Sequence, residues 1–296
     1  MNAGLAAKDR LFLAALILVW AASWPIMKVG VAAVPPIWFA LLRYAIGATL
    51  LFVVVASRGK VEAPVRHDWP LVLVSGALQM ACYSAFTGLA LTLLPPGRAA
   101  VLAYSTPLWV LPLGAWRLKE RVSSEQCVGV ALGVLGIAII AWPSLQAHSG
   151  EQLIAYGLLL AAAGFWAISI VHVRGHKFVG TALALAPWQM LVAAALLLPV
   201  AIATEGPLLR LNATGLIALA YVGPIATAFA YWAIVDLGSR LSATTLSMAL
   251  LATPSLGIMI SAAALGEIID RPLVAGAAAI AAGIGLTIRR SAKRKP

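Results

Sequence analysis

The sequence predicts an all-α membrane protein in which ten transmembrane helices form two five-helix inverted repeats. Three observations predict this fold: a weakly charged composition, ten long apolar stretches, and an internal similarity at a shift of about 147 residues. Of the 296 residues, 62% are hydrophobic and 10% are charged, whereas soluble domains carry about 25% charged residues. Because the chain lacks the polar residues that a water-facing surface needs, we expect lipid to be its main solvent.

Each apolar stretch is long enough for a helix to cross a bilayer, which takes about 20 residues. The stretches end at proline, glycine or charge, as at Pro35–Pro36, Pro95–Pro96 and Arg271–Pro272. Strands of a membrane β-barrel would alternate in polarity over about ten residues, and these long unbroken runs favour helices. The expected spans are residues 11–33, 36–57, 69–91, 97–117, 123–143, 151–172, 182–203, 214–235, 241–265 and 272–290.

The net charge of +11 comes from cations that lie between the spans and in the carboxy-terminal tail. This placement is typical of a topology signal and not of a nucleic-acid surface. If the amino terminus is cytoplasmic, 16 of the 21 Lys and Arg residues lie on the cytoplasmic side and 4 on the other. The sequence therefore predicts a membrane protein whose termini are both cytoplasmic.

The internal similarity divides the chain into residues 1–147 and 148–296, with five expected helices in each. Five is an odd number, so the halves enter the membrane in opposite orientations. Inverted repeats of this kind place a substrate site near the midplane, between the halves, and work by alternating access. A shift of 147 places Thr106–Pro107 on Thr253–Pro254, Glu120 on Glu267, Gly129 on Gly276 and Gly136 on Gly283, and a shift of 146 places Trp20 on Trp166 and Arg43 on Gln189.

Several ordered motifs resemble the EamA-type branch of the drug/metabolite transporter superfamily. They are Trp-Ala-Ala-Ser-Trp-Pro-Ile-Met-Lys at 20–28, the run from Pro35 to Arg43, and a Thr-Pro pair followed by Glu at 106–120 and again at 253–267. The resemblance implies helices of both halves around a central cavity, a place in the bacterial cell inner membrane, and the export of amino acids or other small metabolites. Within that branch the chain looks most like YddG-type exporters of aromatic and other amino acids. The second half departs from the opening motif, since it has Gln189 in place of an arginine.

Ionisable residues inside a membrane are costly and are functional candidates by default. Arg43 could bind a substrate carboxylate through its guanidinium, or it could be a structural cation. Lys28 lies near an interface and could extend its ammonium group to it. Glu120 and Glu267 end equivalent helices, where loop salt bridges could lock one conformational state. We assign Lys28, Glu120 and Glu267 gating or structural roles.

The predicted substrate site is a cavity lined by aromatic and a few polar side chains. Pro107 and Pro254 fall within spans, where each frees a backbone carbonyl and kinks or opens its helix. Each of these residues could instead serve only helix packing. The candidate binding residues are Trp20, Arg43, Gln79, Tyr83, Tyr104, Pro107, Trp166, Gln189, Tyr231 and Pro254.

No Asp or Glu lies in the middle of an expected span, which favours a facilitator or uniporter over a proton-coupled antiporter. The alternative is a proton-coupled exporter of cationic drugs or another small metabolite. We expect no enzyme, because the spans hold neither a nucleophile with its base nor paired aspartates. Cys82 and Cys127 have no metal spacing, so we expect no metal and no cofactor. The expected partners are a small-molecule substrate and the bilayer, with no nucleic acid, for a monomer or homodimer.

The fifth and tenth expected helices are rich in glycine. Small residues at helical spacing let two membrane helices approach closely. We expect these glycines to serve scaffold packing within the chain, although the same surfaces could serve dimerisation. The glycines are Gly129, Gly133, Gly136, Gly276, Gly283 and Gly285.

Overall fold

The computed structural model of the protein describes residues 7–59, 61–208, 210–241 and 243–291, and these residues form helices and no strands. The first half contains α1 (Ala7–Ala33), α2 (Pro36–Arg58), α3 (Trp69–Val74), η1 (Ser75–Cys82), α4 (Tyr83–Leu93), α5 (Pro96–Ala103), α6 (Thr106–Leu118) and α7 (Ser124–Gln146). The second contains α8 (Gly150–Gly175), α9 (Ala182–Glu205), α10 (Ala213–Tyr221), η2 (Val222–Phe229), α11 (Ala230–Arg240), α12 (Ala243–Leu250), α13 (Ala252–Leu265) and α14 (Arg271–Ser291).

The predicted all-α membrane fold is confirmed. Within the described residues, nine helical segments are long and apolar enough to cross a membrane, and Ala252–Leu265 is a shorter apolar helix. The expected span 241–265 is therefore not one continuous helix, because it is divided between α12 and α13. Some of the cations counted for orientation lie outside the described residues, namely Lys60, Lys293, Arg294 and Lys295, and the side chains of Arg289 and Arg290 are not described.

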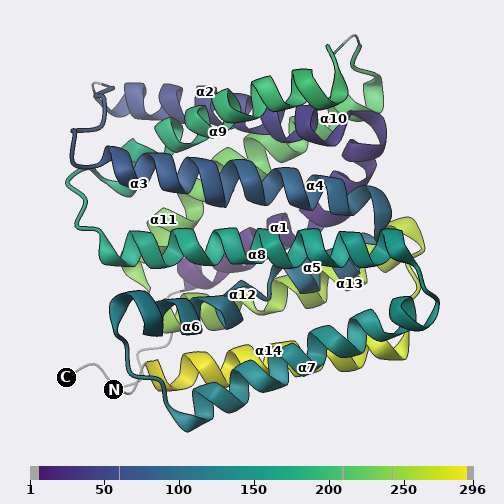
Figure 1. Ribbon diagram of the computed structural model, residues 1–296. Helices are drawn as coiled ribbons and strands as arrows, with labels where there is room; N and C mark the ends of the chain where they lie inside the picture. The colour runs from purple at the N-terminus through teal and green to yellow at the C-terminus, as the bar shows by residue number, and fades with distance from the viewer. Residues whose placement is uncertain (1–6, 60, 209, 242, 292–296) are drawn as a thin grey trace.

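The helical segments lie side by side across the molecule (Figure 1), with α2 beside α9 at one edge and α7 beside α14 at the other. Both described ends of the chain lie at the same end of the bundle. We call this end, where α1 begins and α14 ends, the terminus side. The other end, where α2, α5, α8 and α14 begin, is called the opposite side.

Two spans are broken where the Thr-Pro pairs predict it. The helix stops at Tyr104 and Ser105 before α6, and at Leu251 before α13. Pro107 and Pro254 then lie in the first turns of the new helices, where a missing N–H costs no hydrogen bond. The breaks thus lie two to three residues before the prolines.

Two further irregularities were not expected from the sequence. η1 and η2 are π-helices of eight residues each, whereas most π-helical segments are single turns within α-helices, often at functional sites. They occupy residues 75–82 and 222–229, so they lie 147 positions apart. Only η2 contains a proline, Pro224, so proline content does not mark this pair.

Carboxylates tie the halves together on both sides of the bundle. On the terminus side, Asp68 is fully buried, and its two carboxylate oxygens accept from the backbone N–H groups of Val179 at 2.9 Å and Gly180 at 2.8 Å. On the opposite side, Glu205 at the end of α9 accepts from Ile37 N at 2.9 Å and Trp38 N at 3.0 Å, in the first turn of α2. Each half thereby anchors the start of the other half's second long helix.

Asp68→Asn is expected to lower the thermal stability of the detergent-solubilised protein at neutral pH. Hydrogen bonds from the Val179 and Gly180 N–H groups hold the pKa of Asp68 below its ordinary value of 3.8, against the opposing effect of burial. A carboxyl whose pKa is lowered on folding adds stability above its unfolded pKa and loses it as the pH falls toward the folded pKa. The melting-temperature difference between the two proteins should therefore be constant from pH 7 to 5 and shrink below about pH 4. A difference that grows on acidification would contradict this assignment.

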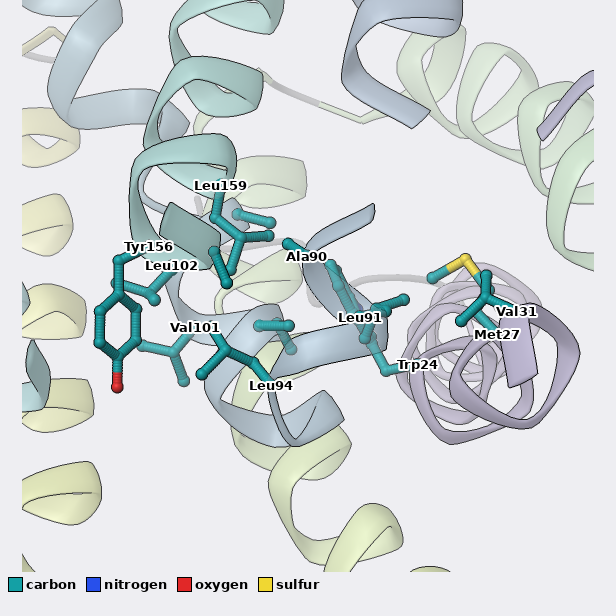
Figure 2. Close-up of a cluster of buried hydrophobic side chains, with 14 of the residues drawn as sticks. Trp24, Met27, Val31, Ala90, Leu91, Leu94, Val101, Leu102, Tyr156 and Leu159 are labelled. Carbon is teal, nitrogen blue, oxygen red and sulfur yellow. The ribbon is translucent and has the colours of Figure 1, made fainter. Parts of the chain in front are cut away.

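The buried apolar side chains of the described residues form several separate clusters. One large cluster joins α1, α4, α5 and α8 through residues such as Trp24, Leu91, Val101 and Leu159 (Figure 2). Toward the terminus side, α1 packs with α11 in one cluster, which includes Leu16 and Leu237, and α3 packs with α9 in another. These two clusters share no residue. A further cluster, which includes Ala40, Leu51, Ala193 and Ala201, joins α2 to α9 along their length.

Candidate functional site

A cavity lies between the two halves and encloses about 720 Å³ of space not occupied by protein atoms, including its open mouth. Helices of both halves supply its walls, including both π-helices. Its lining comprises Trp20, Ser23, Trp24, Met27, Arg43, Tyr44, Gln79, Met80, Tyr83, Tyr104, Trp166, Met190, Ala226, Thr227 and Tyr231.

The structure brings most of the sequence-predicted binding residues together in this lining. Those present are Trp20, Arg43, Gln79, Tyr83, Tyr104, Trp166 and Tyr231. Gln189 lies behind the lining, where its Oε1 accepts from the Tyr231 hydroxyl at 3.0 Å. Pro107 and Pro254 are not among the lining residues and lie just beyond the helix breaks.

Several lining residues were not singled out from the sequence. On α1, Trp20, Ser23, Trp24 and Met27 follow the spacing of three and four that places residues on one helical face. That spacing could have identified Ser23, Trp24 and Met27 once Trp20 was selected. Other helices contribute Tyr44, Met80, Met190, Ala226 and Thr227. Thr227 is marked by its polarity within an apolar span, whereas no spacing marks Met80, Met190 or Ala226.

Arg43 is the charged residue of the lining as the structure describes it. Its Nε donates to Thr227 Oγ1 at 3.1 Å, its Nη1 contacts Met27 Sδ at 3.3 Å, and its guanidinium lies 5.2 Å from the centre of the Tyr44 ring. Ion pairs form in the described residues at Arg98, Arg174 and Arg240 but not at Arg43. The guanidinium has five N–H donors, so it retains donors for a ligand.

Aromatic rings form much of the remaining wall. Tyr83 and Trp166 meet edge to face with ring centres 4.9 Å apart, and Trp24 and Tyr104 lie 6.4 Å apart. The Trp20 indole donates to the Ala226 carbonyl, which lies in η2, at 3.3 Å. These contacts hold rigid apolar faces around the guanidinium.

Two polar side chains of the lining are paired with hydroxyl groups behind it. The Tyr44 and Ser84 hydroxyls are 2.7 Å apart, and Ser169 Oγ donates to Gln79 Oε1 at 3.1 Å. Buried polar groups are costly unless they are hydrogen-bonded, so these pairs fix the rotamers of the lining. The described residues hold no group of three or more His, Cys, Asp or Glu side chains that could bind a metal ion.

The cavity can therefore hold an apolar or aromatic molecule that carries one negative group. A carboxylate would pair with the guanidinium in a region of low dielectric, where charge-assisted hydrogen bonds are strong. A positive group on the same molecule would find aromatic faces, which attract cations, and no carboxylate in the described lining.

The predicted gating residues gather on the opposite side, except for Glu120. Lys28 Nζ donates to the Leu91 carbonyl at 2.6 Å and so joins α1 to the end of α4. Glu267 accepts from Gly97 N at 2.8 Å and Arg98 N at 3.3 Å in the first turn of α5. These partners are backbone amides and not a neighbouring loop cation such as Arg271.

Glu267 is held in a mixed environment. Burial raises the pKa of its carboxyl above the ordinary value of 4.5, while the bonds from Gly97 and Arg98 oppose that rise. The Arg98 side chain also pairs with Asp270, in the loop that follows Glu267. This cluster closes the loop between α13 and α14 over the start of α5.

Glu120 lies on the terminus side and forms an ion pair with Arg174 at the end of α8. The partner of Glu120 therefore comes from the other half and is not a cation next to it in the sequence. Both members are partly exposed, and exposed ion pairs contribute only about 0–1 kcal/mol. This pair is therefore a weak tie.

Comparisons with known proteins agree with this architecture. A model of the EamA-like transporter family matches residues 10–142 and 153–289. A protein of Salmonella typhimurium named probable amino-acid metabolite efflux pump is 26% identical over 305 aligned positions, which cover 97% of this chain and 98% of that protein. The aromatic amino acid exporter YddG of Ancylobacter novellus is 27% identical over 231 positions, covering 76% and 77%.

A solved structure supports the fold. It aligns with a TM-score of 0.67 at 22% identity and covers 98% of this chain and 99% of its own. At this identity the likeness bears on the arrangement of the helices alone. Together with the apolar segments, the matches identify a multi-pass membrane protein.

Proposed function

Because the chain belongs to the EamA-like transporter family, we propose that it exports amino acids, aromatic and other neutral ones, or related small metabolites through the central cavity. The observation that carries this proposal is the Arg43 guanidinium, which has no ion-pair partner in the described residues and faces a wall of aromatic rings. An uncompensated cation inside a membrane is expensive. A substrate carboxylate would compensate it.

Two named relatives support the same substrate class, since one is a probable amino-acid metabolite efflux pump and the other an aromatic amino acid exporter. Their identities of 26% and 27% leave the individual substrate of this chain to be determined by the cavity. We propose that the carboxylate binds Arg43 and that the side chain packs against Trp166 and Tyr83.

Alternating access through two inverted halves, residues 1–147 and 148–296, completes the proposal. It is supported by the paired π-helices and by helix breaks that recur after 147 residues. The distribution of Lys and Arg supports cytoplasmic termini in a bacterial inner membrane. The terminus side would then face the cytoplasm.

Uptake and efflux in proteoliposomes would test the proposal. Labelled Phe, Trp, Thr and Met are loaded on one side, with and without a pH gradient. We expect flux down the substrate gradient that does not respond to pH, since the described lining contains no Asp or Glu to carry a proton. Trp166→Ala should reduce the flux of Phe and Trp more than that of Thr.

Absence of flux for every amino acid would reject the exporter proposal. Flux of a cationic drug driven by the pH gradient would favour the alternative of a proton-coupled exporter. The acid-free lining argues against that alternative, because a cation bound beside Arg43 would be repelled.

A further inference from the structure

Glu120 and Glu267 occupy equivalent places but make different contacts. Each follows a residue in the left-handed conformation that ends its helix, Lys119 with φ 55° after α6 and Gly266 with φ 67° after α13. The backbone therefore presents the two carboxylates in the same way, 147 positions apart. Glu267 nevertheless caps α5, whereas Glu120 pairs with Arg174.

The same shift relates the helix that Glu267 caps to one on the other side of the bundle. Gly97 and Arg98 correspond to Thr244 and Thr245, in the first turn of α12. The start of α12 is thus the repeat-related counterpart of the α5 start. It lies on the terminus side, as Glu120 does.

We propose that Glu267 and Glu120 are alternating latches: Glu267 caps α5 when the opposite side is closed, and Glu120 leaves Arg174 to cap α12 when the terminus side is closed. The inference rests on the alternating-access transport proposed above. It assigns the present structure to the state closed on the opposite side.

Packing around the two latches agrees with this assignment. On the opposite side, α5 packs against α13 and α1, where a side chain at Gly257 would meet Ala100 Cβ at 3.7 Å and Trp24 Cδ1 at 3.6 Å. Trp24 of α1 and Val101 of α5 also belong to one cluster of buried apolar side chains (Figure 2). The exposed Glu120–Arg174 pair is a weak tie that can be exchanged.

The pair Glu205 and Asp68 provides a natural contrast. Each accepts two backbone N–H bonds from the other half, one on each side of the bundle, and both sets of bonds are present together. A contact that exists on both sides at once cannot report which side is open. These carboxylates are fixed ties, so Glu205 is a matched control for Glu267.

The test uses a cysteine reporter at the α5–α13 contact. Cys82 and Cys127 are replaced by Ser, and Ala100, which is fully buried, is replaced by Cys. The rate of labelling by a water-soluble maleimide then measures how often the opposite side opens. No substrate is present, so the result does not depend on whether amino acids are transported.

Glu267→Gln is expected to raise the labelling rate about tenfold, as the loss of a hydrogen-bonded charge worth about 1.4 kcal/mol would do. Gly97→Ala should act in the same direction without removing a charge, because its Cβ would lie 2.8 Å from Glu267 Oε2. Glu205→Gln should leave the rate unchanged. Adding Glu120→Gln to Glu267→Gln should return the rate toward that of the parent, because the competing latch is then also lost.

Equal increases for Glu267→Gln and Glu205→Gln would mean general loosening and would overturn the proposal. An unchanged rate for Glu267→Gln would do the same. If the double variant labels as fast as Glu267→Gln alone, Glu120 is not the second latch. If the labelling rates change as expected but no amino acid is transported in proteoliposomes, only the proposed substrate class is rejected.

Discussion

We expect the Arg43→Gln variant to lose most of its amino-acid flux, because the guanidinium of Arg43 is proposed to bind the substrate carboxylate. A hydrogen-bonded ion pair to a charged group is worth about 1.5–3 kcal/mol, so the apparent affinity should fall by roughly 10- to 150-fold. Arg43→Lys should retain part of the activity, because lysine keeps the charge and loses the two-pronged geometry. Concentration-dependent uptake in proteoliposomes measures both effects.

Arg58→Gln is the matched control for Arg43→Gln. Arg58 lies on the same helix, at its exposed end, with its guanidinium 6.0 Å from the Trp232 ring centre. The Arg58→Gln substitution should leave the apparent affinity for the transported amino acid unchanged. Thermal stability separates function from structure, because removing a partly buried cation that has no ion-pair partner in the described residues should not destabilise the fold strongly. A strongly destabilised Arg43→Gln protein, or one with unchanged affinity, would show that Arg43 is a structural cation.

Gly283→Ala is expected to destabilise the bundle by about 1–3 kcal/mol through overpacking. A Cβ at this position would collide with the backbone of α7, where its nearest contacts are the Gly129 carbonyl oxygen and the Gly133 nitrogen, the latter at 2.9 Å. Backbone atoms cannot move aside as a side chain can. The apparent melting temperature in detergent should fall by several degrees.

Gly285→Ala, two residues further along α14, is the control. A Cβ there meets no atom within 4 Å, and alanine is the better helix former by about 1 kcal/mol. This variant should be as stable as the parent or slightly more stable. Equal destabilisation by both changes would show that helix propensity, and not the α7–α14 contact, controls stability.

The two predictions concern two separate regions of the protein, the α7–α14 contact and the cavity around Arg43. The α7–α14 pair forms an edge of the molecule away from the cavity, and its glycines allow close backbone contact. Arg43 lies in the cavity with donors left for a ligand. A variant such as Gly283→Ala should therefore lower stability while leaving substrate affinity in the remaining folded protein unchanged.

The sequence by itself determined the features that depend on local pattern. Hydropathy fixed the helical segments to within a few residues, because a chain in lipid must bond its backbone internally and helices do so. The Thr-Pro pairs marked the breaks before α6 and α13, because a proline in a first turn costs no backbone hydrogen bond. The motif from Trp20 to Lys28 and the isolated Arg43 pointed to the cavity because polar residues are rare in such spans.

Tertiary structure decided what depends on contact between distant segments. The π-helices have no compositional signal, and Met190 and Thr227 face the cavity only because α9 and η2 pack where they do. Gln189 and Tyr231 were both candidates, and packing alone placed one behind the other. Glu267 accepts hydrogen bonds from backbone amides and not from a neighbouring cation. Those amides belong to α5, which lies 170 residues away in the sequence, so no local pattern could have predicted the contact.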